Sequence, residues 1–142
     1  MNNFLTNTEM ASLVDAIQTA ENNSTGEIRI HIDSTTENHN AEVAFEVFKT
    51  LCKDKTAEKN AVLFHVNFEQ KYLTIIGDEG INKCVHQNFW DVMHDYLTTE
   101  FAKGNFYKAL KSSILKTGIE LKNHFPIKGE NPNELSNEIT FS

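Results

Sequence analysis

The sequence predicts a mixed α/β domain, and two observations about its strands lead to this fold class. A strand, a helix and a second strand follow one another over residues 27–66, which is the pattern of a βαβ unit with parallel strands and a right-handed crossover. A third strand over residues 72–76 follows after a link too short for a crossover, so it returns antiparallel as a hairpin. Helical patterns flank these strands and supply helices to cover the small mixed sheet.

The elements of the first half are predicted from residue spacing. Thr6 and Glu9 form a capping-box pattern, and the apolar residues that follow at helical spacing predict a helix from about residue 7 to about residue 22. Residues 27–33 alternate strictly between isoleucine and polar side chains, which predicts a strand with one apolar face. Apolar residues between 43 and 51 recur at helical spacing and predict an amphipathic helix.

The second half is predicted in the same way. The nearly continuous apolar run 61–66 predicts a strand that is covered on both faces. An apolar stripe from Ile81 to Phe101 predicts one long helix, which ends at Gly104. A last helix is predicted over residues 106–124, just before a Phe-Pro pair.

The chain length fits one domain, because domains commonly hold about 100–150 residues and this chain has 142. We place the domain over residues 1–126. Residues 127–142 are polar and aperiodic, and we expect them to form a flexible tail. Cys52 and Cys84 lie far apart in the sequence and are interpreted as free thiols, although the sequence leaves a disulfide open.

The charge balance excludes one broad class of partner. Thirteen Lys plus Arg against 20 Asp plus Glu give a formal net charge of −7, with no basic stripe of the kind that nucleic-acid binding needs. An acidic surface is compatible with a metal-ion partner. The chain has neither a signal-peptide pattern at its start nor an apolar run near the roughly 20 residues of a membrane span, so we expect a cytoplasmic monomer.

The predicted topology gathers three segments at one end of the sheet. The two parallel strands begin there and the antiparallel strand ends there, which brings together residues 24–27, 59–60 and 77–80. Asp78 and Glu79 offer carboxylate oxygens, and Glu27 and Asn60 are the further oxygen donors at the same end. Such hard, irregular donors predict a metal site that prefers Ca²⁺, with Mg²⁺ as the alternative.

Each of these residues also has a purely structural interpretation. Asp78 or Glu79 can cap the following helix, Glu27 can be a solvated strand carboxylate, and Asn60 can be an ordinary turn amide. The strand histidines His31 and His65 are interpreted as hydrogen-bonded core residues. The sequence offers no convergent set of zinc ligands by local motif, and no nucleophile with a base beside it.

With these segments placed, the chain resembles the TPM domain family. The resemblance covers about residues 5–126 and rests on an ordered set of short motifs: Thr25-Gly-Glu-Ile-Arg-Ile-His-Ile32, Thr56-x-x-Lys-Asn-Ala-Val-Leu63, Ile76-Gly-Asp-Glu-Gly-Ile81, Phe89-Trp90, Phe101-x-x-Gly104, Gly118 and His124-Phe-Pro126. It implies a three-layer α/β/α sandwich with helices on both faces of the sheet. Some members bind calcium at an acidic cluster, and plant lumenal members are reported as acid phosphatases. The family's usual Asn-Gly is Asn60-Ala61 here, so this chain departs from the pattern at the candidate site.

Three functions follow as hypotheses. The first is a calcium-binding module with a regulatory or protein-interaction role. The second is a metal-assisted acid phosphatase of low specificity, in which a metal at Asp78 and Glu79 would bridge the phosphate. The third is an adaptor domain whose acidic cluster is incidental. We favour the binding module because the sequence names no catalytic nucleophile or base.

Overall fold

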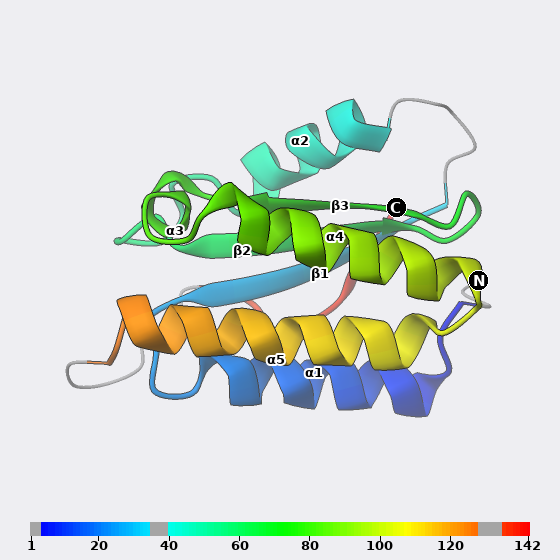
Figure 1. Cartoon of the computed structure of the whole chain (residues 1–142), viewed down its shortest axis with the longest axis horizontal. Helices are drawn as coiled ribbons and strands as arrows, with labels where there is room; N and C mark the ends of the chain where they lie inside the picture. The colour runs from blue at the N-terminus through cyan, green and yellow to red at the C-terminus, as the bar shows by residue number, and fades with distance from the viewer. Residues whose placement is uncertain (1–3, 35–39, 128–134) are drawn as a thin grey trace.

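A computed structural model describes residues 4–34, 40–127 and 135–142 of the chain. In this part of the chain, helices and strands alternate as far as a hairpin, and three consecutive helices then precede the last strand (Figure 1). In chain order the elements are α1 (Asn7–Glu21), β1 (Glu27–Asp33), α2 (Asn40–Leu51), β2 (Ala61–Asn67), β3 (Tyr72–Gly77), α3 (Glu79–Asn82), α4 (Gln87–Ala102), α5 (Phe106–His124) and β4 (Thr140–Phe141).

The sheet has the mixed topology that the sequence predicts. Its strand order is β3-β2-β1-β4, with β1 and β2 parallel and β2 and β3 antiparallel. Glu27 pairs with Ala61 and Val62 pairs with Gly77, so the starts of β1 and β2 and the end of β3 lie at one end of the sheet. The βαβ unit and the hairpin are therefore both confirmed.

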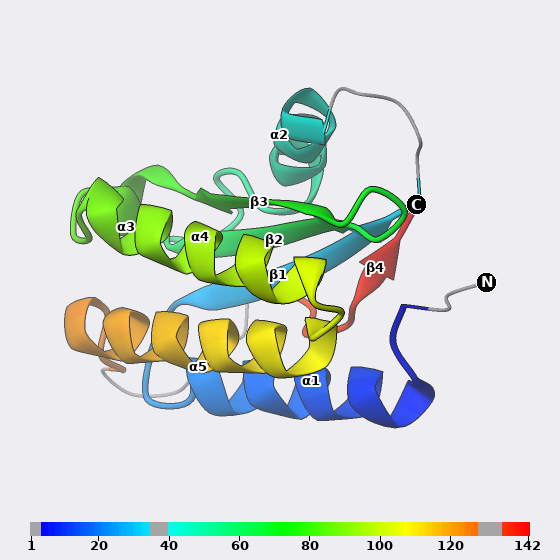
Figure 2. The same cartoon turned by 45° about the vertical axis from the view of Figure 1, so that its right-hand side comes forward.

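The molecule is a three-layer sandwich, as the family resemblance implies. Helix α2 lies over one face of the sheet, and α1, α4 and α5 cover the other (Figures 1 and 2). Alternate residues of β1 and β2 enter the larger core on the three-helix side; these are Ile28, Ile30, Ile32, Val62, Phe64 and Val66. Ala61 and Leu63 face α2 in a smaller core with Phe48, Cys52 and Leu135. Both cysteines are free thiols.

The single long helix predicted from Ile81 to Phe101 is two helices, which corrects that prediction. Helix α3 ends at Asn82, and α4 begins at Gln87 after a turn. Asn82 holds the junction, because its Nδ2 donates to Gly77 O at 2.7 Å and its Oδ1 accepts from Trp90 Nε1 at 3.2 Å. Helical periodicity does not detect this break, since both helices turn their apolar residues to the same core.

The C-terminal segment differs from the predicted flexible tail. Leu135 is buried in the smaller core, and β4 adds a fourth strand parallel to β1, with His31 opposite Thr140 (Figure 2). A strand of two residues shows no alternation of apolar and polar side chains, so it could not be predicted from the residue pattern. Part of the predicted tail, residues 128–134, lies outside the described residues. Among the described helices, none has the length and apolar character needed to cross a membrane.

Candidate functional site

The three predicted segments meet at one end of the sheet, beside α3 at the left of Figure 1. Glu27 N donates to Asn60 O at 3.4 Å, and Asp78 N donates to Ala61 O at 2.9 Å. The backbone therefore brings the segments of Glu27, Asn60 and Asp78 together as the topology predicts. We call this end of the sheet the rim.

Asp78 is buried and its carboxylate has two backbone partners. Oδ1 accepts from Glu79 N at 2.7 Å, at the start of α3, and Oδ2 accepts from Asp54 N at 3.2 Å. The carboxylate thus acts as the helix cap that was one interpretation of the sequence. Its second bond also fixes the loop that joins α2 to β2.

Asn60 is completely buried at the rim and is only partly hydrogen-bonded. Its backbone N–H donates to Thr56 Oγ1 and its Nδ2 donates to Thr25 Oγ1, each at 3.0 Å. Within the described part of the chain, its Oδ1 has no hydrogen-bond partner. Buried amide oxygens nearly always accept a hydrogen bond or contact an ion, so this oxygen is available as a ligand for a cation.

Gly80 allows the loop between α2 and β2 to press against α3. Gly80 N donates to Lys59 O at 2.8 Å, and a Cβ at this position would stand 2.1 Å from Glu58 O. Lys59 itself has a positive φ of 51°, as does Asp54 at 56°. The rim is therefore a tightly folded pair of loops with little room for larger residues.

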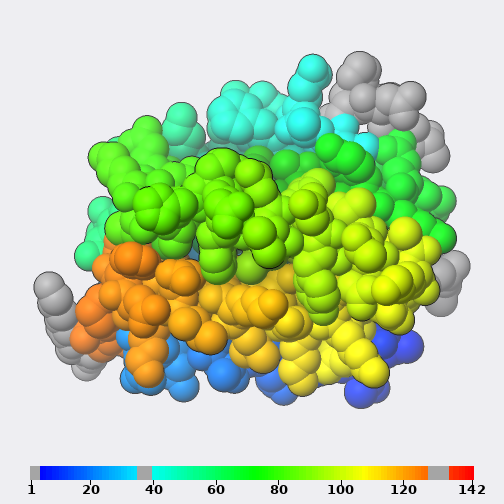
Figure 3. Space-filling view, viewed as in Figure 1, coloured from blue at the N-terminus to red at the C-terminus, as the bar shows by residue number. Residues whose placement is uncertain are grey.

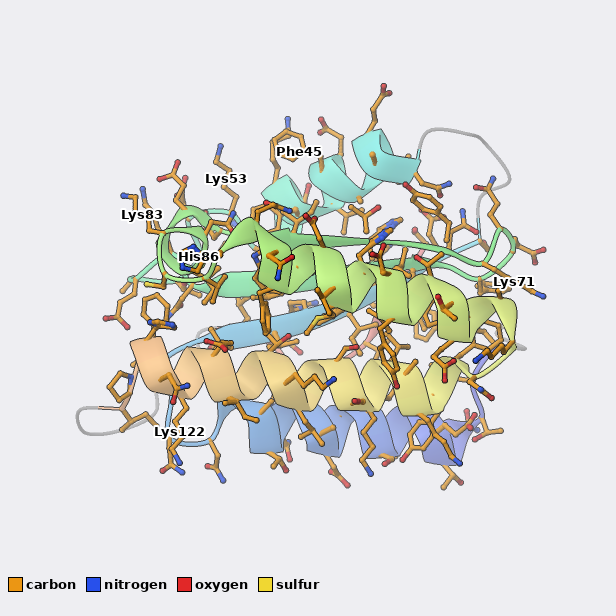
Figure 4. All side chains as sticks on the ribbon, in the orientation of Figure 1. Phe45, Lys53, Lys71, Lys83, His86 and Lys122 are labelled. Atoms are coloured by element: carbon orange, nitrogen blue, oxygen red, sulfur yellow. The ribbon has the colours of Figure 1, made fainter. Side chains whose placement is uncertain are left out.

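In the exposed part of the rim, the ammonium group of Lys59 lies between two carboxylates. Lys59 Nζ lies 3.5 Å from a Glu79 oxygen and 3.6 Å from an Asp54 oxygen. These carboxylates, Glu79 first, raise the pKa of Lys59 above its usual value. Figure 4 shows Lys53 and Lys83 pointing outward at the same end of the molecule. A cation between Glu79 and Asp54 is thus already part of the folded protein.

Glu27, the fourth predicted ligand, is buried and takes part in a different network. Its Oε1 accepts from Leu135 N at 3.0 Å. Its carboxylate also forms a side-chain hydrogen bond with Glu21, whose own Oε2 accepts from Ile28 N at 2.8 Å. Burial, followed by the bond to Glu27, raises the pKa of Glu21 to about 9, so Glu21 is a neutral acid at pH 7. Glu27 thereby ties the C-terminal segment to β1.

A second polar cluster lies near the other end of β1 and contains none of the residues that were predicted as metal ligands. His31, Asp33 and His65 are all buried, with ligand atoms within 4.8 Å of one another. Desolvation lowers the pKa of both histidines, which keeps the imidazoles neutral. The signal was present: strand alternation places His31 and Asp33 on one face, and the parallel pairing of β1 and β2 sets His31 opposite His65.

A groove between α4 and α5 lies on the face seen in Figure 3. Its volume is about 700 Å³, with Phe89, Val92 and Tyr96 on the α4 side and Lys116 and Glu120 on the α5 side. One end of the groove includes residues of the α3–α4 junction, so it is connected through α3 to the rim.

Comparison with known proteins places the chain in a family. The TPM domain model matches residues 1–118. The BA42 protein from the psychrophilic bacterium Bizionia argentinensis has a similar structure, with a TM-score of 0.88 and 39% identity over 100% of this chain and 98% of that one. No curated protein matches the chain.

Two more distant structures share the fold. One is the N-terminal domain of a P. gingivalis protein, with a TM-score of 0.70 and 13% identity over 90% of this chain and 84% of that one. The other is the N-terminal domain of the cg2496 protein from Corynebacterium glutamicum, with a TM-score of 0.64 and 8% identity over 82% and 74%. At these identities the likeness concerns the fold alone. Because the family model covers most of its length, the chain belongs to the TPM domain family.

Proposed function

We propose that this TPM domain binds a divalent cation, preferably Ca²⁺, at the rim, and that it acts as a regulatory or protein-interaction module. The proposed ligands are Asn60 Oδ1 and the carboxylates of Asp78 and Glu79. One observation carries the proposal: the buried Oδ1 of Asn60 has no hydrogen-bond partner in the described part of the chain, although acidic residues surround its loop.

The chemistry of the rim supports calcium over other cations. Ca²⁺ accepts about 6–8 oxygens at flexible geometry, including carboxylates, amide oxygens, backbone carbonyls and water. Asn60 and Asp78 are buried and fixed, whereas Glu79 is exposed and free to adapt. Glu27 would have to give up its bonds to Leu135 and Glu21 to join them, so we place it outside the proposed set.

Lys59 sets the expected strength of the site. Its ammonium stands between Glu79 and Asp54, where an incoming cation would compensate the same negative charge. Calcium binding would therefore displace an existing ion pair, and we expect a moderate affinity that weakens with added salt.

The regulatory role follows from what α3 connects. Glu79 begins α3, and the turn after α3 leads to His86, which is the N-cap of α4 and lines the groove between α4 and α5. A cation that draws Glu79 towards Asn60 would act on this short helix. We propose that calcium changes the shape of the groove and so its affinity for a protein partner.

The test is an NMR titration of the full chain with Ca²⁺ and, separately, with Mg²⁺. We expect calcium to shift the amide signals of residues 54–60 and 77–80 most strongly. The signals of residues 84–89 should shift with the same dependence on calcium concentration. Glu79→Gln should weaken calcium binding by about tenfold, because ligand charge sets the affinity of such sites. Glu46→Gln removes an equally exposed carboxylate on α2 and should leave binding unchanged. Shifts spread evenly over the acidic surface, or equal losses in both variants, would refute the site.

A further inference from the structure

Three potential metal ligands converge beneath α2, in a cluster separate from the rim. His31 and Asp33 lie on β1 and His65 lies on β2, all on the sheet face that α2 covers. The two imidazole rings stack with their centroids 5.6 Å apart and their planes 17° from parallel. His65 Nε2 stands 3.3 Å from Asp33 Oδ2. One nitrogen from each ring and one carboxylate oxygen fall within 4.8 Å of one another.

The hydrogen bonding of His65 is incomplete. The residue is completely buried, and its Nδ1 has no hydrogen-bond partner in the described part of the chain. Its Nε2 stands 3.3 Å from Asp33 Oδ2, which is long for a hydrogen bond. An unsatisfied buried polar group costs about 1–3 kcal/mol, so a native structure that keeps one has a further partner such as water or an ion.

We propose that His31, Asp33 and His65 form a binding site for Zn²⁺. Two imidazole nitrogens and one carboxylate oxygen are a ligand set that zinc uses, in tetrahedral geometry with a fourth position for water or another oxygen. Ligand atoms around a tetrahedral zinc stand about 3.3 Å apart, given metal–ligand distances near 2.0–2.1 Å. The His65–Asp33 contact already has this spacing, and the His31 ring has to turn towards these two ligand atoms to complete the set.

The surroundings of His31 supply the outer contacts that a zinc histidine needs. Its Nδ1 contacts Thr140 Oγ1 and its Nε2 contacts Ser142 Oγ, each at 2.7 Å. One hydroxyl can keep its bond and orient the ring while the other nitrogen binds the metal, as outer partners do in known zinc sites. Both hydroxyls belong to the C-terminal segment, so zinc binding would replace one of the two contacts between His31 and that segment and keep the other.

An entry path for the ion is present. A surface hollow of about 360 Å³ lies between α2 and β4, and His31 lines it together with Glu46, Thr140 and Phe141. The Glu46 carboxylate favours the approach of a cation. Asp33 ends β1 whereas Glu27 begins it, so this site is distinct from the rim and does not depend on the proposed calcium binding.

The test is zinc titration of the full chain after dialysis against a chelator. Calorimetry should show one equivalent of Zn²⁺ bound, and Co²⁺ should give the visible absorption of a tetrahedral site that Zn²⁺ then abolishes. Long-range ¹H–¹⁵N spectra of the imidazoles should show the His31 and His65 signals changing with one equivalent of metal. His65→Gln and Asp33→Asn should each weaken binding by about tenfold or more.

A matched control separates this site from adventitious surface binding. His86 and His124 both line the groove between α4 and α5, and a His86→Gln/His124→Gln double variant removes the same number of imidazoles as the proposed site contains. We expect this variant to bind zinc like the unmodified chain. The proposal is wrong if the double variant loses zinc binding or if the wild type binds no zinc. It is also wrong if the His31 and His65 signals of the wild type do not respond to the metal. The imidazole spectra of the wild type decide the matter even if His65→Gln fails to fold.

Discussion

The two faces of the sheet carry different kinds of residue, although the same strands form both. Towards α1, α4 and α5, β1 and β2 present apolar side chains alone: Ile28, Ile30, Ile32, Val62, Phe64 and Val66. Towards α2, the same strands present Glu27, Arg29, His31, Asp33, His65 and Asn67, all of them buried, with Ala61 and Leu63 as the apolar members. One face therefore supplies most of the stability, and the other carries the buried groups that can bind ions or protons.

The polar face exists at a cost in stability. Burying polar groups is unfavourable unless each finds a partner, and on this face His65 and Arg29 have incomplete hydrogen bonding within the described residues. His65 belongs to the site that we propose for zinc. Stability alone would favour an apolar residue at this position.

The largest expected effect is on stability, and it compares a Leu→Ala substitution in the larger core with one in the smaller core. Leu97 of α4 and Leu63 of β2 are both fully buried, in the larger and the smaller core respectively. Leu97→Ala should lower the free energy of unfolding by about 3–5 kcal/mol, and Leu63→Ala by about 2–3 kcal/mol, because a small core can collapse around the lost volume more easily. Chemical denaturation measures both. A larger loss for Leu63→Ala would contradict the division.

The sequence predicted the fold better than it predicted the contacts of the site. Strict alternation in residues 27–33 and the short link before Tyr72 were enough to fix the mixed topology, and that topology placed Glu27, Asn60 and Asp78 at one end. The apolar stripe concealed the break after Asn82. Strand β4 left no pattern because it has two residues.

The partners of the site residues depend on features that no residue pattern encodes. Asp54 and Lys59 reach Asp78 and Glu79 because both loop residues adopt positive φ. Glycine, asparagine and aspartate are the residues most often found in that conformation, whereas lysine is not, so the backbone of Lys59 could not be predicted from its residue type. The strand histidines were predictable as neighbours, but the incomplete hydrogen bonding of His65 could be seen only in the structure.

The second largest effect is expected at the rim. A Cβ at position 80 would stand 2.1 Å from Glu58 O, a backbone atom that cannot move without the loop. Gly80→Ala should therefore lower the free energy of unfolding by about 3 kcal/mol, the upper range for overpacking. Hydrogen exchange should show faster opening of residues 54–60, while the amides of β1 near His31 keep their protection. Unchanged exchange in the loop would mean that α3 does not hold it.

Glu21, at the end of α1, should make stability depend on pH. Its pKa is about 9 in the folded protein against 4.5 for an ordinary glutamate, so folding favours the protonated form. This contribution is complete below about pH 4.5 and is lost as pH rises towards 9. Glu21→Gln, which is neutral throughout, should gain on the wild type by about 1 kcal/mol for each unit between pH 6 and pH 8. Thermal denaturation of both proteins at several pH values measures the difference. Parallel pH profiles would show that Glu21 is ionised in the fold.

The smallest effect concerns the charge that already occupies the rim. Lys59→Met removes the ammonium between Glu79 and Asp54 but keeps most of the length of the side chain. The ammonium repels a second cation a few ångströms away, so calcium should bind about fivefold more tightly to this variant. Stability should hardly change, since exposed ion pairs contribute little to it.

Lys103→Met is the matched control, because the exposed Lys103 also pairs with a carboxylate, that of the half-buried Glu100, but at the end of α4. Both variants change the net charge equally, so a general electrostatic effect would raise calcium affinity in both. A gain confined to Lys59→Met, and reduced by high salt, would locate the cation between Glu79 and Asp54. If Lys59→Met leaves calcium affinity unchanged, the proposed cation does not approach these two carboxylates. The proposed calcium site would then be wrong, whereas the zinc site at the histidine cluster would be unaffected.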